Sequence, residues 1–429
     1  MAAPLSLSEM SATLCLVLIL LVPLAGTGLA LVNTGIVRSR SAAHVMLASI
    51  CVFAVAAIVY VIFGFSFQGA AGQPAHVLTI GGKAWDWIAA EPFFLRGMKL
   101  DFSPVSLVLL LQMFSVGLVA MIPLGAASER WRLGASCAFT VLLAGGIYPL
   151  FAHWVLGGGW LSQLGSIYGL GQGFLDGGAG SIQVIGGLSA LSIAWTLGPR
   201  QGKYPSGEIP AAIPAHNIVL VLTGSLIAWV GWLGLNSASA ILFNRSDPSS
   251  VVLIVVNTTL SAAAAGLAAA IVTRMRFGRP DASLVANGWM AGLVASSAAA
   301  AFLKPATSVL AGLVAGVIVV YAIDQLEFRL AIDDPGGTIS VHALAGIWGL
   351  ISVPLLSDAA GGQWLAQLIG IATLIGFIFP LIHGVNWVIG RIYPHRVDAE
   401  GEWQGMDLYE LGAAAYPEFV VHSDEFTER

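Results

Sequence analysis

Charged residues are scarce in this chain of 429 residues: Asp, Glu, Lys and Arg together make up only 10%, against about 25% in an ordinary soluble domain. So low a fraction excludes a soluble catalytic domain. Hydrophobic residues make up 57% of the chain, and apolar windows of roughly 20 residues, the length that spans a bilayer core, recur along almost all of it. The composition predicts an all-α polytopic membrane protein.

Cysteine is equally rare, and its three copies lie in apolar runs without metal-like spacing: Cys15, Cys51 and Cys137. Neither a disulfide framework nor a redox site is expected from them. No two histidines stand at ligand spacing within one apolar run, and no nucleotide motif is present. A membrane enzyme or haem protein using His153, His216 and His342 is therefore the weakest hypothesis, and we expect no cofactor, metal or nucleic-acid partner.

Apolar runs bounded by polar or Gly/Pro segments predict about eleven membrane spans. They lie near 11–33, 43–66, 103–125, 132–154, 178–197, 217–241, 250–272, 284–302, 305–323, 338–356 and 364–390. The first is too long for a signal-peptide core and has no basic region before it, so we interpret it as a spanning helix. After residue 392 the composition becomes polar and acidic, which divides the chain into a membrane domain, 1–392, and a cytoplasmic tail, 393–429.

The distribution of Lys and Arg predicts the orientation. An external N-terminus places most of them inside: Arg38, Arg40, Arg130, Arg132, Arg200, Lys203, Arg274, Arg276, Arg279, Arg329, Arg391, Arg396 and Arg429. The external loops keep Lys83, Arg96, Lys99, Arg245 and Lys304. This positive-inside bias favours an external N-terminus and a cytoplasmic C-terminus. The external segment 67–102 is aromatic and amphipathic, and we expect it to be ordered at the membrane surface.

A short internal repeat relates two of the spans. Ser-Ile-Gln-Val-Ile-Gly-Gly-Leu, beginning at Ser181, aligns without gaps to Ser-Val-His-Ala-Leu-Ala-Gly-Ile, beginning at Ser340. Gln183 and His342 then occupy equivalent positions. Two inverted five-helix repeats followed by a final helix would bring these side chains together near the midplane, where transporter folds hold their sites.

Asp176 precedes the fifth span in a Gly-rich loop. A carboxylate there can cap the helix start or attract a cation at a pore mouth, and both roles can hold together. His342 has a stronger functional reading because it lies inside a span with a repeat-related partner, where a neutral imidazole offers one donor and one acceptor.

Motifs along nearly the whole chain resemble the ammonium transporter (Amt/Mep/Rh) family. They include Gly125-Ala-Ala-Ser-Glu-Arg130, Ala152-His-Trp-Val-Leu-Gly-Gly-Gly-Trp160, Ala215-His-Asn217, Gly231-Trp-Leu-Gly-Leu-Asn-Ser-Ala-Ser-Ala240, Asp333-Asp-Pro335 and Gly405-Met-Asp-Leu-Tyr-Glu-Leu-Gly-Ala-Ala-Ala-Tyr-Pro417. The resemblance implies a homotrimer in the cell membrane, with one pore in each subunit. Each pore has an outer recruitment site for a cation, an aromatic gate and two hydrogen-bonded histidines in an apolar lumen.

Only one of the two pore histidines of the family is present. His342 matches the second one, but the first is absent: Gln183 stands there when the alignment is anchored on Gly186 and Gly187, and Val184 when it is anchored on Asp176. We prefer the glycine anchor because the internal repeat independently selects Gln183. A Gln–His pair can hydrogen-bond a solute, but it cannot pass a proton from ring to ring.

The outer site and the gate also depart from the family pattern. In the recruitment site, expected near Asp176, Ser239 and Asn236 keep the family residues, whereas Leu156 replaces a tryptophan. In the gate, Leu235 replaces a phenylalanine and Ser115 stands at the other aromatic position, with Phe114 beside it. Fewer aromatic rings mean weaker cation–π attraction, so recruitment of the ion should weaken.

The leading hypothesis is a transporter or channel for ammonium or ammonia in a lipid bilayer, with methylammonium as a further substrate. The alternative is an ammonium receptor with little flux. The family resemblance also implies that the tail contacts a neighbouring subunit and that a PII-type regulatory protein docks there. Asp407, Glu410, Gly412, Ala415 and Tyr416 keep the pattern of that tail, whereas Leu411 replaces a common histidine.

Overall fold

The structure is a computed structural model that describes residues 7–73, 75–170, 172–206, 209–358 and 361–417. Within these residues, ten helices are long and apolar enough to cross a membrane. In chain order they are α1–α2 (Glu9–Leu21, Pro23–Ile36), α3–η2–α4 (Ala42–Val59, Tyr60–Gly64, Phe65–Gln68), α5 (Pro104–Ala127), α6–η4–α7 (Leu133–Leu142, Leu143–Ile147, Tyr148–Val155), η5–α9 (Ala179–Val184, Ile185–Leu197), α10 (Ile218–Phe243), α11 (Val251–Phe277), α13 (Pro305–Phe328), η7–α14 (Ile339–Leu344, Ala345–Leu356) and α15–η8–α16 (Gln363–Thr373, Leu374–Ile378, Phe379–Ile392). The predicted all-α membrane fold is confirmed, and the helix bounds agree with the predicted spans to within a few residues.

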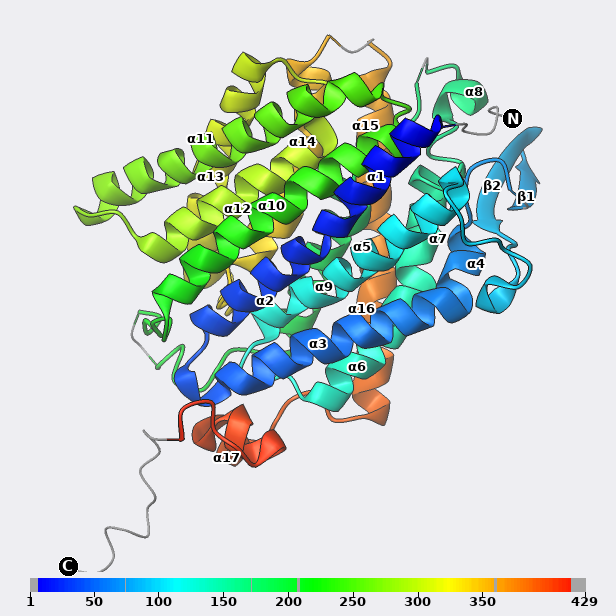
Figure 1. Ribbon diagram of the computed structural model, residues 1–429. Helices are drawn as coiled ribbons and strands as arrows, with labels where there is room; N and C mark the ends of the chain where they lie inside the picture. Colours follow the sequence, from blue (N-terminus) through cyan, green and yellow to red (C-terminus); the bar gives the residue numbers. More distant parts are fainter. Residues whose placement is uncertain (1–6, 74, 171, 207–208, 359–360, 418–429) are drawn as a thin grey trace, which may run out of the picture.

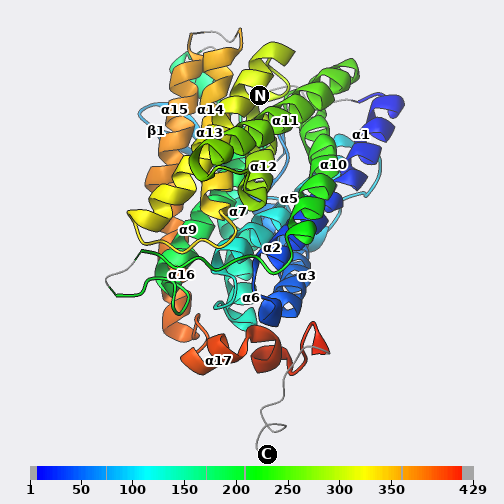
Figure 2. The same ribbon diagram turned by 90° about the vertical axis from the view of Figure 1, so that its left-hand side faces the viewer.

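The remaining predicted span, 284–302, corresponds to α12 (Ala282–Ala299), which is largely buried and packs against α11 and α13. The helix α1 begins at one end of the bundle, whereas α17 (Ala399–Gln404) lies at the other (Figures 1 and 2). We call these the outer and the inner end. Their opposite positions require an odd number of crossings, which favours counting α12 as an eleventh span. The count and the orientation in the membrane stay predictions.

Small residues set the distances between helices. A Cβ atom on Gly28 of α2 would collide with the backbone of α10 at Gly224 and Ala228, and one on Gly231 of α10 would collide with the backbone of α2 at Ala25. The two helices therefore touch almost backbone to backbone. Close van der Waals packing of this kind stabilises helix pairs in a bilayer, where lipid is as apolar as the side chains.

A two-stranded antiparallel sheet stands on the outer end, formed by β1 (Ala75–Ile80) and β2 (Lys83–Ala89) (Figure 1). Gly81 and Gly82 make the connecting loop with φ of 60° and 75°. Glycine adopts this left-handed conformation without steric cost, and tight hairpin turns require it. The sheet was not predicted for this surface segment, although its Gly-Gly pair between two apolar runs is a hairpin signal.

The described part of the tail is folded onto the inner end of the bundle (Figure 2). The N–H of Val397 donates to the carbonyl of Arg130 at 3.0 Å. Further on, the Asp407 carboxylate accepts the N–H of His44 at 2.8 Å and that of Ala43 at 3.2 Å, which caps the start of α3. The tail is therefore an ordered part of its own subunit up to Pro417, and the remaining tail residues lie outside the described ones.

Candidate functional site

Two helices that pass from π to α geometry, η5–α9 and η7–α14, pack against each other. Each begins with six residues in π-helical geometry, which is rare and frequently marks functional sites. A Cβ on Gly187 would collide with the backbone of Ala343, and one on Gly346 would lie 2.8 Å from Val184 Cγ2. Gly187 and Gly346 are the glycines that the internal repeat aligned, so the two segments approach each other in a reciprocal way.

This crossing places Gln183 beside His342. The Nδ1 atom of His342 lies 2.8 Å from Gln183 Oε1, and the two residues are 2% and 0% exposed. Val184 is also buried, but it packs against Gly346. Of the two residues that sequence alignment left open, Gln183 is therefore the hydrogen-bonded partner of His342.

The direction of this hydrogen bond follows from the chemistry of the amide. An amide oxygen only accepts, so His342 Nδ1 carries the proton and donates it to Gln183 Oε1. In the neutral ring, Nε2 then holds a lone pair. Gln183 Nε2 is buried and has no hydrogen-bond partner within the described part of the chain. The pair thus offers one acceptor on the ring and an unused donor on the amide.

Asp176 is a helix cap. Its carboxylate accepts hydrogen bonds from the N–H groups of Gly178 and Gly180 at 2.9 Å, from the N–H of Ser181 at 3.0 Å and from Ser181 Oγ at 2.5 Å. Burial raises the pKa of Asp176, and the hydrogen bonds act to lower it. Both carboxylate oxygens accept hydrogen bonds from the start of η5, so helix capping explains the described contacts of Asp176.

The other residues of the predicted outer site lie along α10. Asn236 is buried and donates from Nδ2 to Thr258 Oγ1 and to Ser296 Oγ, both at 3.0 Å. These bonds tie α10 to α11 and α12. Ser239 is buried one turn further along α10. Among the described residues, no hydrogen bond joins Asn236 or Ser239 to Asp176, so a recruitment role for them stays a proposal.

The predicted gate residues occupy different environments. The Phe114 ring is half-buried and stacks with Phe53 of α3, with ring centroids 6.5 Å apart. Ser115 is fully buried and donates to the carbonyl of Leu111 at 2.9 Å. Leu235 is fully buried within the core. Phe114 therefore faces α3, and the buried positions of the gate carry no aromatic ring.

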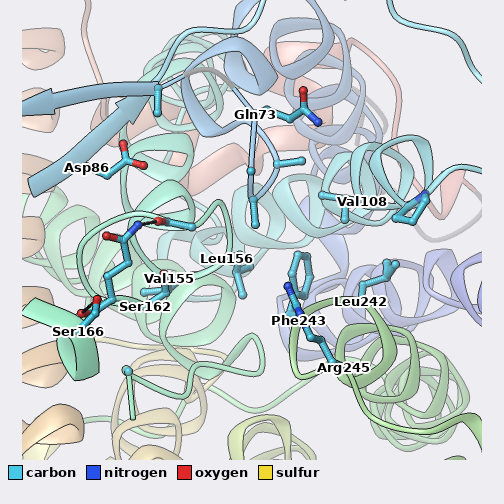
Figure 3. Close-up of a pocket in the computed structure, with 18 of the residues that line it drawn as sticks. Gln73, Asp86, Val108, Val155, Leu156, Ser162, Ser166, Leu242, Phe243 and Arg245 are labelled. Atoms are coloured by element: carbon cyan, nitrogen blue, oxygen red, sulfur yellow. Dashed lines mark hydrogen bonds between the residues drawn. The ribbon is translucent and has the colours of Figure 1, made fainter. Parts of the chain in front are cut away.

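An open cavity of about 1090 Å³ lies at the outer end, and Leu156 is part of its wall (Figure 3). The wall comes from the hairpin, from the start of α5, from the loop after α7 and from the end of α10. Most of it is apolar or small, including Val108, Val155 and Leu242. A ligand pocket typically measures roughly 300–1,000 Å³, so this cavity is far larger than an ammonium ion needs.

The inner end instead holds a network of buried charges. The Arg200 guanidinium forms a bidentate ion pair with Asp333, at 2.9 and 3.0 Å, and reaches Glu129 at 2.7 Å. Glu129 also pairs with Arg38, and Arg130 lies 3.7 Å from Asp333. Such pairs are expensive to desolvate and hold together only when each charge keeps its partners.

The network separates the titration of two adjacent aspartates. Burial acts to raise the pKa of Asp333, but the hydrogen bonds and charge of Arg200 hold it at about 2. Burial raises the pKa of Asp334 to about 6. Asp334 Oδ2 accepts the N–H of Ile339 at 2.7 Å, whereas its buried Oδ1 has no hydrogen-bond partner in the described residues.

The tail closes this inner end with acidic side chains. Glu410 Oε2 lies 2.9 Å from His44 Nε2 and accepts the N–H of Leu133 at 2.9 Å. The hydrogen bonds and charge of these neighbours hold the pKa of Glu410 below its usual range, although burial acts to raise it. Tyr416 Oη lies 3.1 Å from His216 Nε2. Within the described residues, no group of three or more His, Cys, Asp or Glu side chains could hold a metal ion.

The chain belongs to the Ammonium Transporter Family, whose model matches residues 12–416. It is 33% identical to ammonium transporter Amt2 of Archaeoglobus fulgidus, an alignment that covers 93% of this chain and 86% of that protein. It is also 31% identical to the ammonium transporter of Bacillus subtilis, over 92% of this chain and 96% of that protein. The sequence resemblance is thereby confirmed, and the chain is a multi-pass membrane protein.

Solved structures give the same fold. A structure titled Sensor Amt Protein superposes with a TM-score of 0.84 at 26% identity, covering 93% of this chain and 97% of that one. Mep2 of Candida albicans superposes with a TM-score of 0.78 at 25% identity, covering 95% and 90%. The similar structures thus include one protein named as a sensor as well as Mep2.

Two features escaped the sequence analysis. The first is the network of ion pairs at the inner end. Its members Glu129, Arg130 and Asp333 stand out in a chain with so few charges, but only their family motifs were recognised and their pairing was not predicted. The second is Asp86, which lies on β2 and lines the outer cavity. It was missed because no hairpin was predicted there.

Proposed function

We propose that this chain transports ammonium or ammonia across a membrane, along a path that passes the Gln183–His342 pair. Membership of the Ammonium Transporter Family supports this function, as do relatives named as ammonium transporters. The observation that carries the path is the buried hydrogen bond between Gln183 and His342 where η5–α9 and η7–α14 pack together. Burying polar groups in an apolar core is costly, and such groups inside membrane spans by default indicate a function.

The direction of that hydrogen bond favours neutral ammonia as the species at the pair. Ammonia can accept an N–H from Gln183 Nε2 with its lone pair and donate an N–H to His342 Nε2. An ammonium ion has no lone pair, so it would face the Gln183 amide donor without an acceptor to offer. The apolar surroundings add a desolvation cost for any ion. The proton is then left on the outer side, and flux should carry little charge.

The test is transport by the purified protein in proteoliposomes. An inward ammonium gradient should raise the internal pH, because ammonia that enters binds a proton, and it should give little or no steady current. His342→Ala should abolish the pH change, whereas His76→Ala, which alters a histidine on the exposed hairpin, should leave it intact. The absence of any ammonium-dependent signal from the assembled wild-type protein would refute transport.

Gln183→His sharpens the test of the species. A second imidazole would restore a pair of titratable rings, through which a proton can pass from one to the other. We expect this variant to gain an ammonium-dependent current that the wild-type chain lacks. A wild-type current as large as that of Gln183→His would show that the Gln–His pair already conducts charge.

A receptor with little flux is the second candidate. Its support is the superposition on the structure titled Sensor Amt Protein, together with a tail bonded to the starts of α3 and α6. Cells that lack other ammonium transporters distinguish the two functions. Growth on limiting ammonium after expression of this chain favours transport, whereas ammonium binding without growth favours the receptor.

The assembly and partners are part of the same proposal. A homotrimer would cover exposed apolar helix faces such as those around Val219, Leu226 and Val252, and size-exclusion chromatography with light scattering can measure it. A PII-type regulatory protein would dock at the inner end, where the tail presents its surface. Loss of regulation with intact flux after deletion of residues 405–417 would support that coupling.

A further inference from the structure

The outer cavity has one acidic side chain among the described residues of its wall, and it belongs to the hairpin. Asp86 of β2 projects toward the cavity that Leu156 also lines (Figure 3). Its side chain is 16% exposed. One oxygen, Oδ1, lies 3.0 Å from His153 Nε2, and no described residue hydrogen-bonds to the other oxygen. Asp86 therefore presents a free carboxylate oxygen at the outer end.

Asp86 is held in place from several sides. The His153 ring bonds through Nδ1 to the carbonyl of Gln68 at 2.8 Å. The carbonyl of Asp86 itself accepts the N–H of Trp160 at 2.9 Å, and Trp154 Nε1 donates to the carbonyl of Trp87 at 2.8 Å. These bonds fix β2 to the end of α7 and to the loop after it. The carboxylate is thus preorganised, so little conformational entropy is lost when it binds a ligand.

The other candidates for attracting a cation at this end are already engaged or absent. All hydrogen-bonding capacity of Asp176 that the structure describes is directed at the start of η5. Leu156 offers no π face to a cation. Arg245, across the same cavity, has the wrong charge. Of these candidates, Asp86 has an oxygen that can accept a hydrogen bond from a cation with N–H donors.

We propose that Asp86 is the cation-binding group of the outer cavity and that it takes ammonium and small primary ammonium ions such as methylammonium. The ion donates an N–H to the free carboxylate oxygen while its methyl group, where present, contacts the apolar wall. A His153 ring that donates from both nitrogens, to the Gln68 carbonyl and to Asp86 Oδ1, balances the charge of Asp86, so the attraction acts at contact distance rather than as a long-range field. This assignment rests on the proposed function for the identity of the ion.

The experiment measures methylammonium binding by calorimetry on the purified full-length protein, and transport of the same ion in proteoliposomes. Asp86→Asn keeps the shape and an acceptor for His153 but removes the charge. We expect its Kd and its KM to rise about two- to fivefold, the range of a partly exposed charge interaction, with little change in maximal flux. Asp86→Glu should recover most of the affinity. Asp358→Asn, an exposed outer carboxylate beside Lys304, is the matched control and should change neither.

The outcomes separate the two proposals. Wild-type binding without transport would refute the transport function and leave the Asp86 assignment to be decided by the Kd values. Wild-type Kd and KM retained in a folded Asp86→Asn variant would overturn the assignment, as would an equal change in Asp358→Asn, which would indicate a general surface-charge effect. No saturable binding by the wild-type protein would overturn the Asp86 assignment, whereas the transport function would still be decided by the ammonium-dependent pH change. Thermal unfolding of each variant shows whether the hairpin contacts survive.

Discussion

An aspartate precedes each of the helices η5–α9 and η7–α14, at opposite ends of the bundle, and these two aspartates have different surroundings. Asp176 precedes η5, and its carboxylate accepts four hydrogen bonds from the first residues of its own helix. Asp334 precedes η7 and accepts the N–H of Ile339, but one of its oxygens is buried without a partner in the described residues. The outer carboxylate is fully used for capping, whereas the inner one keeps capacity for a proton.

The two ends of the bundle differ in the same way as the two aspartates. The outer end has an open cavity of about 1090 Å³ with a mainly apolar wall. The inner end has ion pairs among Arg38, Glu129, Arg200 and Asp333, covered by the tail. The outer end is thus open to a solute, whereas the ion pairs of the inner end fix several chain segments relative to one another. Variants at each end should therefore fail in different ways.

The largest effect should come from breaking the inner network. Arg200→Met leaves Asp333 and Glu129 buried with fewer partners, and removing one member of a buried ion pair costs about 3–5 kcal/mol. We expect a large fall in the yield of assembled protein and in its thermal unfolding temperature. Arg276→Met is the control, since Arg276 pairs with Asp324 at a partly exposed site, where a pair contributes about 0–1 kcal/mol. Equal losses in the two variants would contradict the special role of the network.

The outer cap should come next. Asp176→Ala removes four hydrogen bonds to a charged acceptor, and we expect a loss of about 2–3 kcal/mol in unfolding free energy, more than an ordinary cap contributes. Asp281→Ala, which removes a cap that accepts from Leu284 N–H and Ser283 Oγ, should cost about 1 kcal/mol. Thermal or denaturant unfolding in the same detergent measures both. An Asp176 variant as stable as the Asp281 variant would show that the cap is less demanding than its contacts indicate.

Titration of Asp334 at the inner end should make the unfolding temperature depend on pH. The pKa of Asp334 lies at about 6, above its usual 3.8, so the folded state favours the protonated acid. Its stabilising contribution is complete below about pH 3.8 and is lost as the pH rises through 6. Asp334→Asn removes this titration, so the unfolding temperature of the variant minus that of the wild type should increase from pH 4 to pH 7.

Asp333 provides the opposite sign. Its pKa of about 2 means that its contribution is present above pH 3.8 and is lost only as the pH falls through 2. Between pH 4 and pH 7 it should add no slope, so the slope in that window belongs to Asp334 rather than to its neighbour. Asp358→Asn should show a pH-independent difference from the wild type, and a flat difference for Asp334→Asn as well would contradict the assignment.

The sequence predicted the membrane spans and the Gln183–His342 pair because both depend on patterns along the chain. Apolar run length fixes the spans, and the aligned glycines fix which residues face one another at the crossing. Asp86, in contrast, becomes meaningful only when a hairpin folds back over the outer end. The charge network likewise joins residues as distant as Glu129 and Asp333, whose pairing depends on tertiary packing rather than on local spacing.

The smallest expected effect tests the outer end alone. Leu156→Trp returns an aromatic face to the cavity wall, and a cation–π contact at an exposed site contributes about 0.5–1 kcal/mol, so the KM for methylammonium should fall about two- to fivefold. Leu156→Met, similar in volume but without a ring, is the control and should leave KM unchanged. If both variants lower KM alike, the gain comes from altered packing. If neither does, an aromatic ring at this position adds no attraction, and recruitment at the outer end does not depend on residue 156.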